Sequence, residues 1–258
     1  MQHVMERDLR PALHAEVRSV PFWSPFNWLW RGARDIVACW PGNAAHGLLM
    51  VAFGWVLIVM LGAHPYFLAA ATSGFLLLAP IMTTSLCELS RRRELGASLD
   101  FDSSLEALGR NGPALFKFGI LLAAFAVGWF LVSELLLKSV FHVTTPAVAE
   151  TFYRGFLDTS NRSQLEFYVA SGAVLALLVF VLSVVTVPLI IDRGASASQA
   201  MAVSARVVAR NPTTMLLWAA LLVGFTMAGF ATLLFGLILV IPLLGHSSWH
   251  AYRDLIAR

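Results

Sequence analysis

Five long apolar stretches restrict this chain to a fold in which lipid, rather than water, surrounds much of the surface. Four of them have the length of a membrane-spanning helix, which needs about 20 mostly apolar residues: Ala44–Gly62, Tyr66–Cys87, Ala114–Leu137 and Phe167–Ile191. Hydrophobic residues make up 58% of the chain and charged ones 13%, whereas soluble domains have about 25% charged residues. A globule of this size could not bury so much apolar surface. We therefore expect an all-α membrane protein.

The fifth stretch, Pro212–Gly245, has no charged side chain and is too long for one ordinary span. As a single helix it would be about 51 Å long, against a hydrocarbon core of about 30 Å. It forms either one overhanging helix or two short spans that reverse near Met227–Gly229.

An internal repeat favours the two short spans. Three times, a stretch with polar residues ends at a proline, an apolar span follows, and a second span carries a late proline; these prolines are Pro41, Pro113, Pro212, Pro80, Pro188 and Pro242. Asn111 and Asn211 precede two of these units and are suitable N-caps for the helices that follow. The sequence therefore predicts six transmembrane helices as three repeated hairpins, each preceded by an interfacial amphipathic helix. The predicted spans are about 44–62, 66–87, 114–137, 167–191, 212–228 and 229–245.

The distribution of basic residues predicts how these spans are oriented. With six spans, the side that holds both termini carries fourteen arginines, and the other side carries Lys138, Arg154 and Arg162. Positive residues concentrate on the cytoplasmic side of membrane proteins. We therefore expect a multi-pass protein of a bacterial inner membrane, with both termini in the cytoplasm. We expect residues 1–25 to form a cytoplasmic segment and residues 26–258 to form a single membrane domain, inserted without a cleavable signal peptide.

Three segments have the one-sided pattern of helices that lie in the membrane interface. The first has an apolar face of Leu29, Ala33, Ile36, Val37 and Trp40, with Arg31, Arg34 and Asp35 opposite. Trp23, Trp28 and Trp30 are expected at the depth of the lipid headgroups. The other two interfacial helices are predicted at Leu99–Arg110 and Ser198–Arg210, and a short helix on the outer surface is predicted within His142–Glu166.

Two histidines near the C-terminus are the candidate metal ligands. His246 and His250 are four residues apart, a spacing that places both imidazoles on one face of a helix, where they can share a metal. His46 begins the first span on the same predicted side, and zinc would need further ligands of this kind. Alternatively, these histidines bind water, carbonyls or phosphates at the membrane interface.

The motifs of common enzyme classes, such as nucleotide-binding loops and the HExxH metalloprotease pattern, are absent from the sequence. No charged residue lies at the centre of a predicted span, which disfavours an ion-coupled transporter. We therefore predict a non-enzymatic accessory or scaffold protein without a cofactor, which binds membrane lipids and other inner-membrane proteins but no nucleic acid. One alternative is a protein that handles haem or a metal such as copper, for example in respiratory-complex assembly, through His246 and His250. Another alternative is a small-molecule transporter or channel.

The end of the sequence resembles a known family. The run Pro242–Asp254 is similar to the C-terminal signature of a bacterial membrane family catalogued as domain of unknown function 2189, and segments 188–193 and 210–220 resemble it too. The likeness extends from about Trp30 onward. It implies a bacterial inner-membrane protein and, because the family has no known activity, it implies no mechanism.

Overall fold

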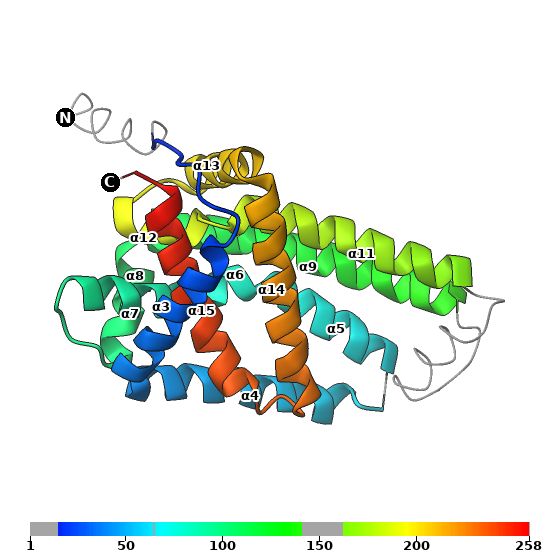
Figure 1. Cartoon of the computed structure of the whole chain (residues 1–258). Coiled ribbons are helices and arrows are strands. Elements are labelled where there is room, and N and C mark those ends of the chain that lie inside the picture. The colour runs from blue at the N-terminus through cyan, green and yellow to red at the C-terminus, as the bar shows by residue number, and fades with distance from the viewer. Residues whose placement is uncertain (1–14, 64, 141–161, 258) are drawn as a thin grey trace. The chain divides into compact units, whose positions relative to one another are not determined.

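The computed structural model describes residues 15–63, 65–140 and 162–257, and the regular elements in these ranges are helices (Figure 1). The predicted all-α class is therefore confirmed. The helices are α3 (Ser24–Ala38), α4 (Trp40–Leu61), α5 (Pro65–Leu77), α6 (Ala79–Met82), α7 (Thr84–Glu94), α8 (Phe101–Arg110), α9 (Gly112–Val140), α11 (Arg162–Ser183), α12 (Thr186–Arg193), α13 (Ala197–Arg210), α14 (Pro212–Ala231) and α15 (Leu237–Leu255). The predicted outer surface helix lies mostly at 142–161, outside the described residues.

Four helical stretches are long and apolar enough to cross a membrane: Gly42–Leu61, Gly112–Ser133, Glu166–Arg193 and Pro212–Ala231. A fifth crossing is possible if Ala71–Leu77 and Ala79–Glu94, which meet at an angle of 57°, act as one bent span. This bend lies next to Pro80, and proline disrupts helix continuity because it lacks an N–H group and its ring clashes with the preceding turn. The helix α15, which contains most of the predicted sixth span, is not among these stretches.

The chain divides into two compact units. Unit 1 comprises residues 1–51, 80–118 and 180–258, and unit 2 comprises residues 52–79 and 119–179. The boundaries fall within α4, α6, α9 and α11, so these four helices contribute residues to both units.

Unit 1 is built around α15, which packs against α3, α7, α12 and α14 (Figure 1). Two glycines permit close contacts of α15 with α3 and α7. A Cβ atom on Gly32 of α3 would lie 2.3 Å from Ser247 Oγ, and one on Gly245 of α15 would lie 2.6 Å from Leu86 Cδ1. Because these positions lack a side chain, α15 approaches both α3 and α7 closely.

The long uncharged stretch 212–245 contains two helices, as the two-span alternative predicts, but the break lies at residues 232–236 rather than at 227–229. Gly229 remains in α14 and packs on α15, where an added Cβ would lie 2.4 Å from Leu237 Cδ2. The turn itself is formed by Leu233 and Leu234, which have positive φ angles. Small residues therefore mark the contact between these helices, and the reversal follows later in the chain.

Helices occur at all three predicted interfacial segments. Asp100 caps α8 by accepting a hydrogen bond from the Ser103 backbone, and Ser196 forms a capping box with Gln199 at the start of α13. These caps explain why both helices begin where they do. The predicted capping role of Asn211 is wrong, because its side chain bonds the N-terminal segment instead, at Val20 N (2.9 Å).

The face that α3 presents to the protein differs from the predicted one. Its buried residues are Pro25, Trp28, Gly32 and Asp35. Trp28 is therefore not exposed to headgroups as predicted; it packs edge-on against Trp218 of α14. Asp35 was expected on the polar face of α3, opposite the apolar one. It is buried instead, because groups from other helices pair with its carboxylate.

Unit 2 contains polar contacts between helices in otherwise apolar surroundings. Trp129 of α9 donates a hydrogen bond to Ser73 Oγ of α5 (2.8 Å), and the hydroxyls of Ser133 and Tyr168 lie 2.7 Å apart. The ring of Trp129 also packs on Tyr168 and over Gly172 of α11. Hydrogen bonds of this kind join membrane helices where apolar packing alone gives little specificity.

Candidate functional site

A buried carboxylate in unit 1 joins three helices. Asp35 of α3, whose exposed fraction is 3%, accepts hydrogen bonds from Arg93 and Ser90 of α7. His250 Nε2 of α15 lies 3.0 Å from the same carboxylate. With His246 and Asn43, these side chains form what we call the Asp35 cluster.

His246 is fully buried in this cluster, and its two ring nitrogens have protein partners. Nε2 lies 2.8 Å from Asn43 Oδ1, and Nδ1 lies 2.7 Å from Ser90 Oγ. Because the Asn43 amide nitrogen donates to Ile36 O, the amide oxygen faces His246, and Nε2 must carry a hydrogen. In a neutral ring, the lone pair that a metal would need is then on Nδ1 beside Ser90, whose single hydroxyl hydrogen can serve either this nitrogen or Asp35 but not both at once.

Burial and hydrogen bonding determine the charges of these groups. Burial lowers the pKa of His246 to about 4, although the nearby Asp35 acts in the opposite direction. For Asp35 itself, burial raises the pKa, but hydrogen bonds from His250 and Ser90 outweigh this effect and hold the pKa below its ordinary value. At neutral pH the cluster therefore contains an uncharged His246 and a charged Asp35 that pairs with Arg93.

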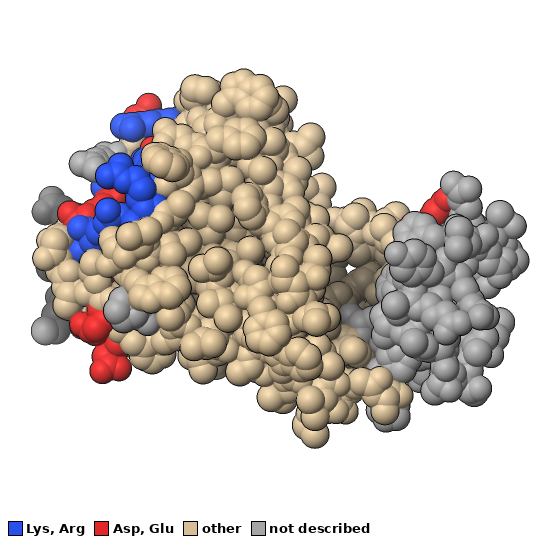
Figure 2. Space-filling model, turned by 60° about the horizontal axis from the view of Figure 1, so that its bottom comes forward, with Lys and Arg blue, Asp and Glu red and all other residues tan. Residues whose placement is uncertain are grey.

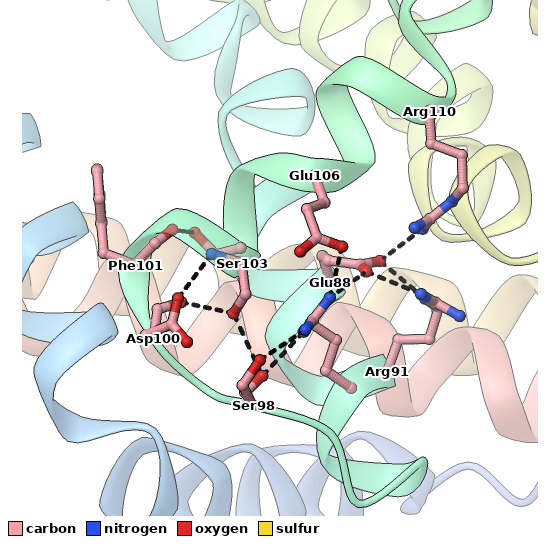
Figure 3. A network of polar contacts seen from close by, with 10 residues as sticks. Glu88, Arg91, Ser98, Asp100, Phe101, Ser103, Glu106 and Arg110 are labelled. Carbon is pink, nitrogen blue, oxygen red and sulfur yellow. Dashed lines mark hydrogen bonds and ion pairs between the residues drawn. The ribbon is translucent and has the colours of Figure 1, made fainter.

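A second carboxylate connects α7 with α8 (Figure 3). Glu88 is fully buried and accepts two hydrogen bonds from Arg91, each 2.8 Å long, and one from Arg110 (3.0 Å). Arg92 lies 4.0 Å from Glu88 and bonds Glu106 at 2.8 Å. We call these five residues the Glu88 cluster; each of them has an oppositely charged partner within the cluster.

Two further carboxylates bind indole groups of unit 1. Glu94 accepts a hydrogen bond from Trp249 Nε1 (2.9 Å) and pairs with Arg253 (3.1 Å). Asp254 accepts one from Trp28 Nε1 (2.8 Å) and pairs with Arg31. These contacts attach the end of α15 to α3 and α7.

A cavity of about 270 Å³ lies next to the Asp35 cluster. Its lining residues come from α3, α7 and α15 and are Arg31, Arg34, Asp35, Ser90, Arg93, Glu94 and His250. The cavity and both clusters lie within unit 1.

Residues 67–192 match the model of a family described as a predicted integral membrane protein (DUF2189). Over this range, the chain is similar to the DUF2189 family. Neither a curated protein nor a solved structure gave a match. The DUF2189 match contains the whole Glu88 cluster, as well as Ser90 and Arg93 of the Asp35 cluster. The C-terminal run in which the sequence resembled this family lies outside the matched residues.

The predicted metal ligands of this chain occupy two environments. His246 and His250 both belong to the Asp35 cluster, as their spacing on one helix face suggested. His46 has other partners: Nδ1 lies 2.7 Å from Gly42 O, and the ring packs on Phe101 of α8. Among the described residues, no group of three or more His, Cys, Asp or Glu side chains is arranged to hold a metal. The metal site stays a prediction.

Asp35 and Ser90 were not predicted from the sequence as members of the site. One signal was available, because Trp28, Gly32 and Asp35 recur at intervals of four and three residues, which places them on one helix face. A glycine on that face permits close helix contact. This pattern would have predicted the buried side of α3 correctly.

Proposed function

We propose that this chain is a non-enzymatic accessory or scaffold protein of a bacterial inner membrane. The observation that carries this proposal is that the buried charged groups are matched within the protein. Asp35 and Glu88 each bind groups from neighbouring helices, so both clusters hold helices together. Such fully connected networks make a structure rigid and unique.

The exposed residues of the candidate spans support contacts with lipid or partner helices. Large apolar side chains there remain exposed: Val59, Phe116, Val174 and Leu216. Because the spans of a membrane protein are surrounded by lipid or other helices, such faces are suitable for binding either.

The proposal also includes the topology of the chain in the membrane. We propose six spans as three repeated hairpins with cytoplasmic interfacial helices and cytoplasmic termini. The pairing of the two chain ends supports an even number of crossings, since Val17 and Ile256 form an antiparallel bridge and must lie on the same side of the membrane. The bent pair and α15 would then add two crossings to the four long apolar stretches.

The charge distribution supports the cytoplasmic position of these ends. Most of the charged side chains visible in Figure 2 gather in one area. Arginines of unit 1 surround the Asp35 and Glu88 clusters, and basic residues concentrate on the cytoplasmic side of membrane proteins.

A photo-reactive amino acid at an exposed span position tests the accessory role. In intact cells, we expect a photo-reactive amino acid in place of Leu216 of α14 to form a covalent product with lipid or with one specific membrane protein. A photo-reactive amino acid at Ala97, an exposed position between α7 and α8 outside the candidate spans, is the control and should not give these products. Vesicles that contain the purified chain should release ions and small solutes no faster than empty vesicles; chain-dependent release would contradict the proposal in favour of a transporter or channel.

The haem- or metal-handling alternative has one supporting observation. His250 lines the cavity together with Asp35, and His246 lies in the same cluster. Purified protein would be analysed for metal, and its optical spectrum would be recorded before and after addition of haem or copper. A spectral change that His250→Ala abolishes, at unchanged thermal stability, would favour this alternative. An unchanged spectrum would remove it.

A further inference from the structure

The helix α3 keeps large apolar side chains exposed on one side. We call this side the aromatic face; its members are Trp23, Phe26, Trp30 and Val37, with exposed fractions of 66%, 47%, 67% and 80%. Arg34 is also exposed and follows Trp30 by four residues, which places it on the same face. Aromatic residues combined with a basic one are typical of helices that lie in the membrane interface.

The position of α3 along the chain indicates what covers the aromatic face. α3 ends at Ala38, and the candidate span Gly42–Leu61 begins four residues later. A helix directly before a span lies where the hydrocarbon meets the headgroups, and indole rings favour that depth. At this position, the aromatic face is therefore expected to be covered by phospholipid.

The helix α3 lines part of the cavity of unit 1. The acidic side chains of this cavity already pair with arginines. Asp35 binds Arg93, and Glu94 pairs with Arg253. Arg31 pairs with Asp254.

Two groups at the cavity have no such partner among the described residues. Arg34 makes no ion pair there, and Arg31 Nε is buried without a hydrogen-bond acceptor. The cavity thus keeps one positive charge that no carboxylate compensates and one unused donor. Guanidinium groups bind phosphate through parallel hydrogen bonds, and this geometry makes arginine well suited to phosphate recognition.

We propose that this cavity binds the phosphate of an anionic phospholipid. Arg34 supplies the uncompensated charge, Arg31 supplies a further donor, and the acyl chains lie along Trp30 and its neighbours on the aromatic face. The site goes beyond the accessory role proposed above and does not depend on it, because lipid would occupy the site whether or not a partner protein binds the spans.

Quenching of tryptophan fluorescence by brominated lipids tests the proposal. The full chain in mixed micelles would be titrated with brominated phosphatidylglycerol or, separately, with brominated phosphatidylcholine. We expect quenching at a lower fraction of phosphatidylglycerol. Arg34→Gln should raise that midpoint about fivefold, the factor that corresponds to about 1 kcal/mol for one basic side chain near anionic lipid.

Arg206→Gln is the matched control, since it removes the same charge from an exposed position on α13 and should leave the midpoint unchanged. Trp30→Phe should reduce the quenching amplitude and so assign the signal to the aromatic face. Equal thermal unfolding midpoints would show that the Arg34 variant is folded.

Four outcomes would overturn the site. The first is an equal midpoint for the two lipids in the unaltered chain, and the second is an equal effect of the Arg34 and Arg206 substitutions. The third is complete competition by soluble glycerol phosphate, which would identify a free phosphate ester as the ligand. A change from dimer to monomer in Arg34→Gln would likewise assign the aromatic face to a second copy of the chain.

Discussion

At the scale of single residues, the structure depends on carboxylates that are buried but not isolated. Asp35 is acceptable in the core of unit 1 because Arg93 and Ser90 reach it from α7 and His250 reaches it from α15. An unpaired buried charge would be very costly. The same side chain therefore stabilises the native arrangement and penalises any arrangement in which these helices separate.

Replacement of Asp35 by Asn should destabilise the protein strongly. The substitution leaves Arg93 without its partner, and we expect a loss of about 2–4 kcal/mol, the range for breaking a largely buried, hydrogen-bonded ion pair. Thermal or denaturant unfolding of the purified chain in detergent measures this loss. Asp102→Asn, at an exposed position of α8, should change stability by less than about 1 kcal/mol; equal losses for both variants would contradict the role of Asp35.

Acidification should also weaken the fold, through His246. Its pKa is about 4 in the folded protein and 6.5 ordinarily, so the unfolded chain binds the proton more readily between these values. Stability is therefore complete above pH 6.5 and falls as the pH decreases from 6.5 to 4, by on the order of 3 kcal/mol. Unfolding followed by tryptophan fluorescence at several pH values should show this slope.

His246→Gln provides the control for the pH effect, since glutamine does not titrate. The variant is expected to be less stable at neutral pH, and its stability should vary less between pH 6.5 and 4. A slope as steep as that of the unaltered protein would show that other groups cause the loss.

At the scale of helices, small residues decide which elements approach each other. α15 contacts α3 at Gly32, where an added Cβ would lie 2.9 Å from Ser247 N. Backbone atoms at that distance cannot move aside as the end of a flexible side chain could. The contact between α3 and α15 in turn brings Asp35 to His250, so a glycine on one helix positions the polar cluster.

Gly32→Ala and Gly109→Ala should have opposite effects. We expect Gly32→Ala to lower the free energy of unfolding by about 1–3 kcal/mol, the usual cost of overpacking. Gly109 of α8 has no atoms within 4 Å of an added Cβ, so alanine there should raise helix stability by up to about 1 kcal/mol. Unfolding measurements on both variants check the pair, and a stabilised Gly32→Ala would refute the close contact.

At the scale of the whole molecule, the pairing of the chain ends limits the membrane topology. Arg18 N donates to Leu255 O (2.8 Å), and Ala257 N donates to Glu16 O (2.9 Å). Residues joined in this way occupy one side of the bilayer, which is compatible with four or six crossings and incompatible with five.

Reporter fusions test this topology. A reporter at either end of the chain should be active in the cytoplasm, and one inserted at Gly62, between α4 and α5, should be active on the opposite side. Reporters at the two ends that respond on different sides would contradict both the paired ends and the six-span proposal.

The sequence by itself determined which parts of this chain are helical and apolar. Long runs without charge predicted the four candidate spans, and the one-sided patterns of Leu99–Arg110 and Ser198–Arg210 predicted α8 and α13 closely, because these signals act within a few residues of the chain. The uncharged stretch 212–245 contains two helices, as the internal repeat favoured; that both cross the membrane stays a prediction.

Only the tertiary structure decided which polar residues form a site. Asp35 resembles an outward-facing residue of an interfacial helix until α7 and α15 supply its partners, and Trp28 resembles an interfacial anchor until Trp218 and Asp254 cover it. Burial of a charge depends on the side chains that other helices bring to it. Those contacts join residues far apart in the chain, so a local pattern such as the spacing of Trp28, Gly32 and Asp35 can indicate the buried face of α3 but not the partners that meet it.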